Sequence, residues 1–124
     1  MPEITTHRCG AGLDEFVRIE PADDLQNGVH HKYQFYVKVH DVWGKVPEGK
    51  VTFQAGPMDR TGPNGVSMES LIAVVIDHLQ GFQKGEFSCR ENAVALTHLE
   101  TALLWLHKRT RDRVTRGVEG RLVK

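Results

Sequence analysis

Three arginines near the end of the chain are the residues best suited to binding chemistry. Arg109, Arg113 and Arg116 are spaced four and three residues apart, so on a helix they share one face. A guanidinium group matches phosphate oxygens at two points, so this face could clamp a phosphate. Cations near a helix C-terminus also stabilise the helix macrodipole. The spacing alone leaves both interpretations open.

Two further side chains could contact a ligand. Phe82 stands near the end of a helical pattern. If exposed, its ring could stack on a nucleobase with an arginine plane on the other side, although a phenylalanine at helical spacing is also an ordinary core residue. Asn92 interrupts a stripe of leucines. A buried asparagine needs hydrogen-bond partners, so Asn92 could read a ligand edge or fix the helix register.

The remaining reactive side chains do not combine into a catalytic or metal site. Cys9 and Cys89 are far apart and form neither a metal-binding pair nor a disulfide framework, which is typical of reduced thiols in a cytosolic protein. His30 and His31 point to opposite faces of a strand, and no carboxylate or thiol completes a set with His40. We therefore predict no catalytic residue, no metal and no cofactor.

A long helix must position most of these residues. Ser88 and Glu91 form a possible capping box at its start, and Gly117 is a typical C-cap at its end. Positions at alternating steps of four and three define one stripe along this helix. The stripe consists of Asn92, Leu96, Leu99, Leu103, Leu106, Thr110 and Arg113. It begins as apolar packing and becomes polar and cationic toward the C-terminus.

A shorter helix precedes it, from Met68 to about Gln83, with Ser67 as its cap. Its expected apolar face consists of Met68, Leu71, Ile72, Val75, Leu79 and Phe82. Because only about five residues link the two helices, we expect an antiparallel αα-hairpin.

The N-terminal part is predicted to form strands. Alternating or β-rich segments cover Leu13 to Ile19, Lys32 to Trp43 and Lys50 to Gln54, with turns at Asn27-Gly28 and Gly44 to Gly49. The candidates for burial in the first segment are Leu13, Phe16 or Val17, and Ile19. These strands would form a small antiparallel β-meander.

We therefore predict an α+β fold in a single domain of residues 1–124. The β-meander would cover residues 1–56, a Gly- and Pro-rich loop residues 57–67, and the helical hairpin residues 68–124, ending in the long C-terminal helix.

The charge distribution favours a local anionic partner. The chain has 16 Lys and Arg against 16 Asp and Glu. The segment from Leu106 to Lys124 has seven cationic and two acidic residues, so it carries +5 and the remainder carries −5. This uneven charge disfavours general attraction to nucleic acid. We also expect no signal peptide and no membrane span, because the longest apolar run, Leu71 to Ile76, is too short.

The unequal helix lengths predict a homo-oligomer. The second helix would be roughly 42 Å long and the first roughly 24 Å, at about 1.5 Å per residue. The first helix can therefore cover only part of the second. The apolar residues expected in the remainder are Leu103, Trp105, Leu106 and Val114. Exposed residues of this kind need a partner, and the long helices of further copies would supply it.

Five motifs, in order, resemble the phage Thoeris anti-defence sponge family of the first type. The resemblance covers roughly residues 50–121 and includes a helical hairpin that this family shares with anti-CBASS cyclic-nucleotide sponges. The motifs are Val51-Thr-Phe-Gln-Ala-Gly-Pro, Gly62-Pro-Asn-Gly-Val with the helix that follows, Gly81-Phe-Gln, Cys89-Arg-Glu-Asn-Ala, and Arg109-Thr-Arg-Asp-Arg with Arg116-Gly-Val-Glu-Gly.

The resemblance implies binding and not an enzyme. Family members hold intact the cyclic ADP-ribose isomers made by bacterial TIR proteins, and several also bind cyclic dinucleotides or trinucleotides. They are oligomers, up to hexamers, built through the long helices, with ligand pockets near subunit junctions. The resemblance places such a protein in the cytoplasm of the infected bacterial host.

The resemblance also assigns roles to residues. Phe82 and Arg109 would sandwich the adenine base, Asn92 would hydrogen-bond the ligand, and Arg113 would contact the diphosphate or ribose. Phe16 is the candidate for an N-terminal aromatic in the pocket, and Arg60 could add a phosphate contact. The alternative function is a small DNA-binding phage regulator that uses the basic C-terminal helix; the acidic balance of the remaining chain disfavours it.

Overall fold

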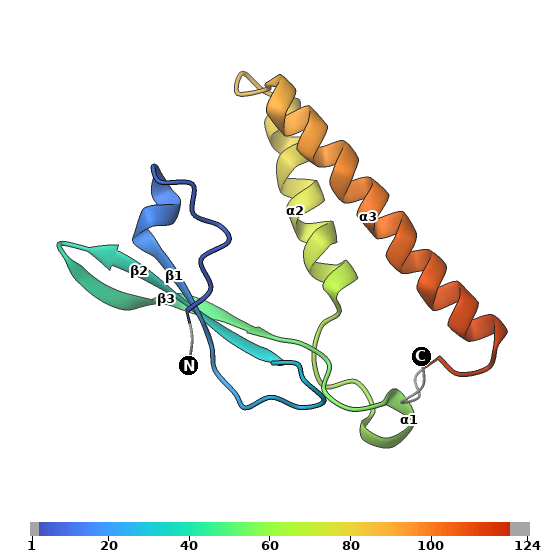
Figure 1. Ribbon diagram of the computed structural model, residues 1–124. Helices are drawn as coiled ribbons and strands as arrows, with labels where there is room; N and C mark the ends of the chain where they lie inside the picture. Colours follow the sequence, from blue (N-terminus) through green and yellow to red (C-terminus); the bar gives the residue numbers. More distant parts are fainter. Residues whose placement is uncertain (1–2, 120–124) are drawn as a thin grey trace. The chain divides into compact units, whose positions relative to one another are not determined.

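The computed structural model describes residues 3–119, and the chain divides into two compact units, Met1–Ala55 and Gly56–Lys124 (Figure 1). The first unit carries a β-sheet and the second carries helices, which confirms the predicted α+β class. The last five positions of the predicted hairpin range, 120–124, lie outside the described residues.

The first unit is built on a three-stranded antiparallel sheet in the order β1-β2-β3. The strands are β1 (Val17–Pro21), β2 (Lys32–Val39) and β3 (Val42–Thr52). The turn predicted at Asn27-Gly28 is present in the β1–β2 connection, with positive φ angles of 52° and 80°. Such angles suit Asn-Gly in a two-residue turn.

The predicted turn at Gly44 to Gly49 is wrong, because the chain already reverses at His40 and Asp41. These two residues have φ angles of 51° and 60°, and the pair Val39 and Val42 closes the turn. A two-residue turn with positive φ at both positions matches the twist of the strands, so the hairpin closes there.

The Gly44 to Gly49 segment instead lies inside β3, and its residues 46–49 form a bulge. Regular pairing ends at Tyr36 with Lys45 and resumes at Gln34 with Lys50, so the register shifts between these pairs. The side-chain amide of Gln34, which is only 5% exposed, donates a hydrogen bond to the Gly49 carbonyl at 3.2 Å. A glycine in a strand is typical of such a bulge.

The start of the first predicted strand is also wrong. Leu13–Phe16 forms a 3₁₀ helix, η1, and the strand begins only at Val17. Gly12, at φ 82°, directs the chain into this turn, and its carbonyl accepts a hydrogen bond from Glu15 N–H at 3.2 Å. Leu13 is therefore 74% exposed and not buried as predicted.

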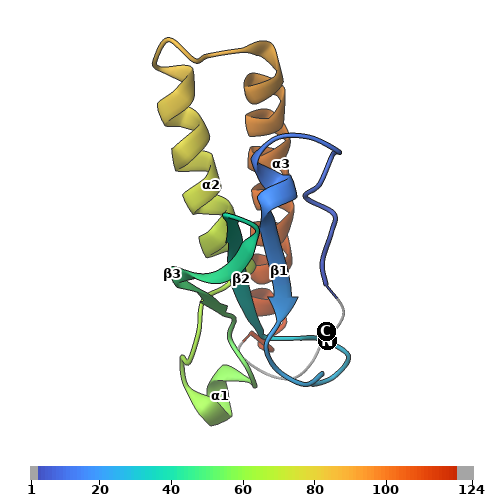
Figure 2. The same cartoon turned by 90° about the vertical axis from the view of Figure 1, so that its left-hand side faces the viewer.

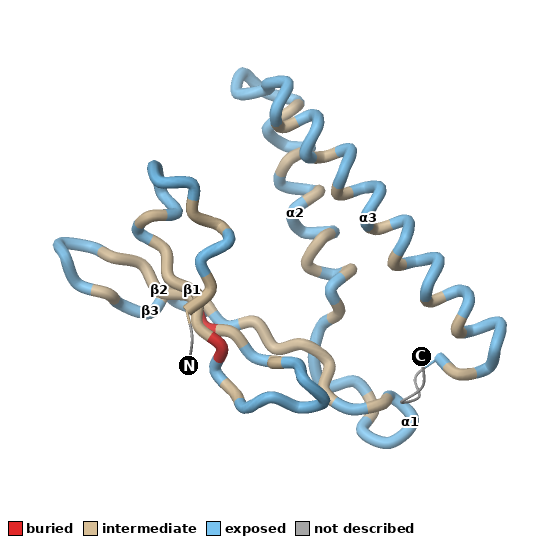
Figure 3. The backbone as a smooth tube through the Cα atoms, viewed as in Figure 1, coloured by how far each residue is buried: buried red, intermediate tan, exposed pale blue. Residues whose placement is uncertain are grey.

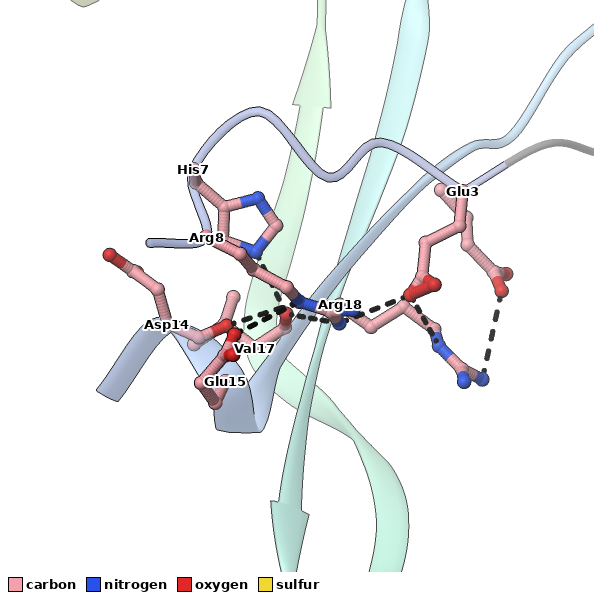
Figure 4. A network of polar contacts seen from close by, with 8 residues as sticks. Glu3, His7, Arg8, Asp14, Glu15, Val17 and Arg18 are labelled. Carbon is pink, nitrogen blue, oxygen red and sulfur yellow. Dashed lines mark hydrogen bonds and ion pairs between the residues drawn. The ribbon is translucent and has the colours of Figure 1, made fainter. Parts of the chain in front are cut away.

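A polar network fixes the N-terminal segment onto β1. Figure 4 shows Arg8 and Arg18 reaching the carboxylate of Glu3, each at 3.1 Å. Arg8 also donates to the carbonyl of Val17 at 3.0 Å. Arg18 lies 4.5 Å above the ring of Trp43 on β3, so the network extends across the sheet.

The second unit contains α1 (Met58–Thr61), α2 (Met68–Gln83) and α3 (Arg90–Thr115). The short helix α1 occupies part of the loop predicted at 57–67. Both views show α2 and α3 side by side as an antiparallel hairpin (Figures 1 and 2). Among the described residues, none of the helices combines the length and the apolar character that crossing a membrane requires.

Two helix ends are capped as predicted. Ser67 Oγ accepts from Ser70 N–H at 3.1 Å, and the two hydroxyl oxygens lie 2.7 Å apart. At the other end, Gly117 adopts φ 73°, and Val118 N–H donates to the Arg113 carbonyl at 2.9 Å. This is the Schellman arrangement, in which glycine stops the helix without steric strain.

The capping box predicted for Ser88 and Glu91 is wrong. The N-cap of α3 is Cys89, and no side chain of the helix start caps it. The side-chain amide of Gln83, on α2, bonds to the N-cap instead. It accepts a hydrogen bond from Cys89 N–H at 3.1 Å and donates one to the Cys89 carbonyl at 3.2 Å. One side chain therefore ties the two helices together at their turn.

The stripe predicted on α3 is confirmed. Its seven positions, from Asn92 to Arg113, are half-buried, and the other residues between them are exposed. The predicted face of α2 is partly wrong, because Ile76 and Gln83 are half-buried, whereas Val75 and Phe82 are 45% and 40% exposed. The packed face of α2 is therefore rotated by about one residue from the predicted one.

Neither unit completes a hydrophobic core. Among residues 3–119, only Pro21 and Gln34 are buried, and no other apolar side chain reaches that state (Figure 3). The α2–α3 seam covers one side of each helix, while Leu104 and Trp105 on α3 remain 64% and 67% exposed. Apolar area of this extent on a short chain marks a surface that is suited to a partner.

We expect Ser67→Ala to lower the free energy of unfolding by about 1 kcal/mol, because it removes the cap of α2. Ser88→Ala is the matched control: in the described structure the Ser88 side chain does not cap α3, so its removal should change little. Urea unfolding followed by circular dichroism measures both variants. Equal losses would contradict the capping assignments.

Asp23 provides a second test, because its carboxylate holds the start of β2. It accepts hydrogen bonds from His31 N–H at 3.0 Å and from Lys32 N–H at 3.2 Å. Partial burial raises the pKa of Asp23, but these hydrogen bonds and the neighbouring His30 and His31 outweigh it and hold the pKa below 3.8.

A lowered pKa means that the stabilisation by Asp23 is complete above about pH 4 and is lost as the pH falls through the folded-state pKa. We expect Asp23→Asn to lower the urea midpoint at pH 7, and the difference from the wild type to shrink toward pH 3. Asp24→Asn is the control, since Asp24 is exposed. A difference that stays constant with pH would contradict this role.

Candidate functional site

Arg109 lies near the C-terminal end of α3, and about half of its side chain is exposed to solvent. Its side chain is 53% exposed, and its Nη2 is 3.8 Å from Oε1 of Glu69 in the first turn of α2. The nearby acid Asp112 pairs instead with Lys108, at 2.8 Å. One nitrogen of the Arg109 guanidinium therefore lies within ion-pair distance of a carboxylate, and about half of the side chain stays accessible to a ligand.

Arg113 has a different environment from Arg109, although both lie on the predicted basic face. Its side chain is 15% exposed and donates to the Glu119 carboxylate at 3.2 Å and to the Val118 carbonyl at 2.8 Å. Arg116 is the C-cap residue of α3. A phosphate that reaches Arg113 would take the place of the Glu119 carboxylate.

The electrostatic environment at this end of α3 is positive. The hydrogen bond from Lys108 is the main cause that lowers the pKa of Asp112, and Arg116 and Arg111 add to it against the effect of partial burial. The lowered pKa of Asp112 thus reflects mainly its own ion pair with Lys108, with a smaller effect of the surrounding arginines.

Phe82 lies in the last turn of α2 and is 40% exposed. The His78 ring, one turn earlier, meets it edge to face, with 5.0 Å between ring centroids. Together they line a shallow hollow of about 290 Å³ at the helix turn, completed by Gly81, Gly85 and Phe87. An open hollow with a fixed aromatic wall can accept a flat ring by stacking.

Asn92 lies in the first turn of α3, half-buried on the stripe that packs against α2. It therefore lies toward the same end of the hairpin as Phe82. Its two predicted roles, ligand contact and helix register, both remain predictions.

The structure does not bring Phe82 and Arg109 together within one hairpin. Gln83 contacts Cys89 at the turn, whereas Glu69 contacts Arg109 at the opposite end. The segment of α2 between Glu69 and Phe82 spans about 20 Å at about 1.5 Å per residue. The predicted adenine sandwich therefore needs one of its two sides from another molecule.

The other two predicted site residues belong to elements outside the α2–α3 hairpin. Phe16 ends η1 in the first unit and is 52% exposed. Arg60 lies in α1 of the second unit and is exposed. Both side chains are accessible, and their contacts with a ligand remain predictions.

Two partners of the candidate residues were not predicted from the sequence. Glu69 faces Arg109 across the seam, and His78 supports Phe82. The contact between His78 and Phe82 could have been predicted from the sequence, because residues four apart on a helix are neighbours. The Glu69–Arg109 pair was implied only by the antiparallel hairpin, which places early α2 beside late α3.

The described part of the chain, residues 3–119, contains no group of three or more His, Cys, Asp or Glu side chains placed to hold a metal ion. The candidate site therefore consists of arginines, an aromatic ring and an amide.

Comparisons with known proteins relate this hairpin to a family. The model of the Acb2/Tad1 hairpin domain matches residues 48–111, which include α2 and most of α3. A protein of Bacillus phage SBSphiJ7, named Thoeris anti-defense 1, is 57% identical over 84 residues. This match covers 68% of the chain and 58% of the phage protein, so the chain matches less than two thirds of that relative's length. The chain belongs to the Acb2/Tad1 hairpin family, the Thoeris anti-defence sponge family that its motifs resemble.

Proposed function

We propose that this chain is a phage anti-defence protein that binds and sequesters, without degrading it, a cyclic ADP-ribose signal made by Thoeris TIR proteins. Glycocyclic ADP-ribose is the proposed ligand, and cyclic dinucleotides or trinucleotides of CBASS are further candidates. The protein would act in the cytoplasm of the infected bacterium. Family membership and the 57% identity to a Thoeris anti-defence protein support this role.

The observation that carries the proposal is the separation of two accessible binding groups on one hairpin. Phe82 is 40% exposed, and the Arg109 side chain is 53% exposed at the opposite end. A second copy, packed antiparallel, would bring its Arg109 to the Phe82 of the first. The junction would then offer a stacking sandwich for a purine and nearby guanidinium groups for the diphosphate.

The exposed apolar side chains of the hairpin support a homo-oligomer built through the long helices. They lie on both helices and at the turn, and they are Met68, Val74, Val75, Phe82, Phe87, Val94, Leu104, Trp105 and Val114. Further copies of the chain would cover them and complete the core that one copy lacks. A hexamer is the assembly that the family resemblance suggests.

The chemistry of the candidate residues favours holding a ligand over cleaving it. Arginine stays protonated at neutral pH, so Arg109 and Arg113 are poor general bases. Phenylalanine and asparagine do not titrate. To out-compete a cellular sensor, such a site needs nanomolar affinity, about −12 kcal/mol. A cyclic ligand helps to reach this value because it loses less conformational entropy on binding.

We expect Arg109→Ala and Phe82→Ala each to weaken binding of glycocyclic ADP-ribose by about tenfold to a hundredfold, from lost charge-assisted bonds and lost stacking. Isothermal titration calorimetry measures the affinity, and thermal unfolding checks the fold. Because both side chains are substantially exposed, the melting temperature should change little.

Arg111→Ala is the matched control, because it removes the same charge from an exposed position two residues away on α3. It should retain most of the affinity. A collapse of the melting temperature in Arg109→Ala or Phe82→Ala would assign these residues to structure. Tight binding to long DNA duplexes, with steep salt dependence, would instead favour the DNA-binding alternative.

Mixing the two defective variants tests whether the site is shared between copies. In assemblies formed from equal amounts of Phe82→Ala and Arg109→Ala chains, about a quarter of the junctions would combine an intact Phe82 with an intact Arg109. We expect calorimetric titration of the co-refolded mixture with glycocyclic ADP-ribose to show tight binding at about a quarter of the sites. A mixture that binds no better than either variant alone would place both groups of one site in a single chain.

A further inference from the structure

The carboxylate of Glu69 faces the guanidinium of Arg109 across the helical seam. Its Oε1 is 3.8 Å from Arg109 Nη2, and the Glu69 side chain is only 21% exposed. This oxygen is buried and has no hydrogen-bond partner among the described residues. A buried carboxylate oxygen in this state is costly, so its placement needs a separate explanation.

Within residues 3–119, the ion pair of Arg109 is with Glu69, and the next two acids along the chain have other partners. Asp112 is held by Lys108 at 2.8 Å, and Glu119 is held by Arg113 at 3.2 Å. The backbone positions of both residues are fixed, because Glu69 is in the capped first turn of α2 and Arg109 is in the regular part of α3. The pair is therefore part of the hairpin itself.

We propose that Glu69 is a positioning residue for the nucleotide site. Its carboxylate attracts one edge of the Arg109 guanidinium and so presents the flat face of that group to a nucleobase. A guanidinium has its N–H donors in its plane and can stack through its faces, so one group can satisfy both contacts at once. This inference rests on the proposed function and adds to it the residue that orients Arg109.

If Glu69 acted only through its charge, its removal would change the ligand affinity in the opposite direction, which makes the inference testable. The proposed ligand carries a diphosphate, so removal of a nearby negative charge should strengthen its binding if Glu69 acted only through its charge. Glu69 also stabilises the N-terminus of α2 through the macrodipole, and loss of that effect lowers stability without a specific effect on affinity. Only an orienting role predicts weaker binding that depends on Arg109.

The experiment is a double-mutant cycle on the full chain, titrated with glycocyclic ADP-ribose by calorimetry. We expect Glu69→Gln to weaken binding about tenfold in the wild-type background and to have little further effect in the Arg109→Ala background. Glu100→Gln, an exposed acid on α3, is the matched control and should bind as tightly as the wild type. Thermal unfolding of each variant confirms that the hairpin is intact.

The outcomes separate the two proposals. Wild-type affinity or tighter binding in Glu69→Gln, or an equal loss in both backgrounds, would overturn the positioning role and leave the proposed function in place. If the wild-type chain itself does not bind the nucleotide, the proposed function fails, and the positioning role fails with it.

Discussion

The seam between α2 and α3 is the interaction on which the rest of the structure depends. It covers one stripe of each helix, and its two ends are fastened by Gln83 with Cys89 and by Glu69 with Arg109. Because this seam covers only one side of each helix, Trp105 and Phe82 remain accessible. Its antiparallel direction also places Phe82 and Arg109 at opposite ends. The incomplete core and the separation of the two candidate binding groups therefore have the same physical origin, and the proposed homo-oligomer would resolve both.

The sequence predicted the parts of the fold that follow from periodicity. The stripe on α3 was predicted correctly because Leu96, Leu99 and their neighbours repeat at helical spacing without ambiguity. On α2, apolar residues occur on more than one side, so the packed face could not be distinguished from the face that holds Phe82. The sheet turn was misplaced because His40 and Asp41 are weaker turn signals than Gly44, which pairs regularly with Val37, and Gly49, which lies in the bulge.

The identities of the candidate binding residues came from spacing and from the family resemblance, but their arrangement did not. Sequence spacing relates residues on one element, whereas the contacts of Arg109 and Arg113 come from other segments. Each arginine has a carboxylate partner, Glu69 or Glu119, and the two differ in exposure: 53% for Arg109 and 15% for Arg113. Arg109 is thus accessible for stacking, while a phosphate at Arg113 must compete with Glu119. This difference in environment was visible only in the folded hairpin.

Capture and release of the nucleotide tests the central claim most directly. The purified protein would be incubated with glycocyclic ADP-ribose, separated from free ligand and heat-denatured, and the released molecules identified by mass spectrometry. Sequestration predicts intact ligand, at a fixed ratio to subunits. Recovery of cleaved products would contradict it and identify an enzyme. If no nucleotide is recovered, glycocyclic ADP-ribose is excluded as the ligand.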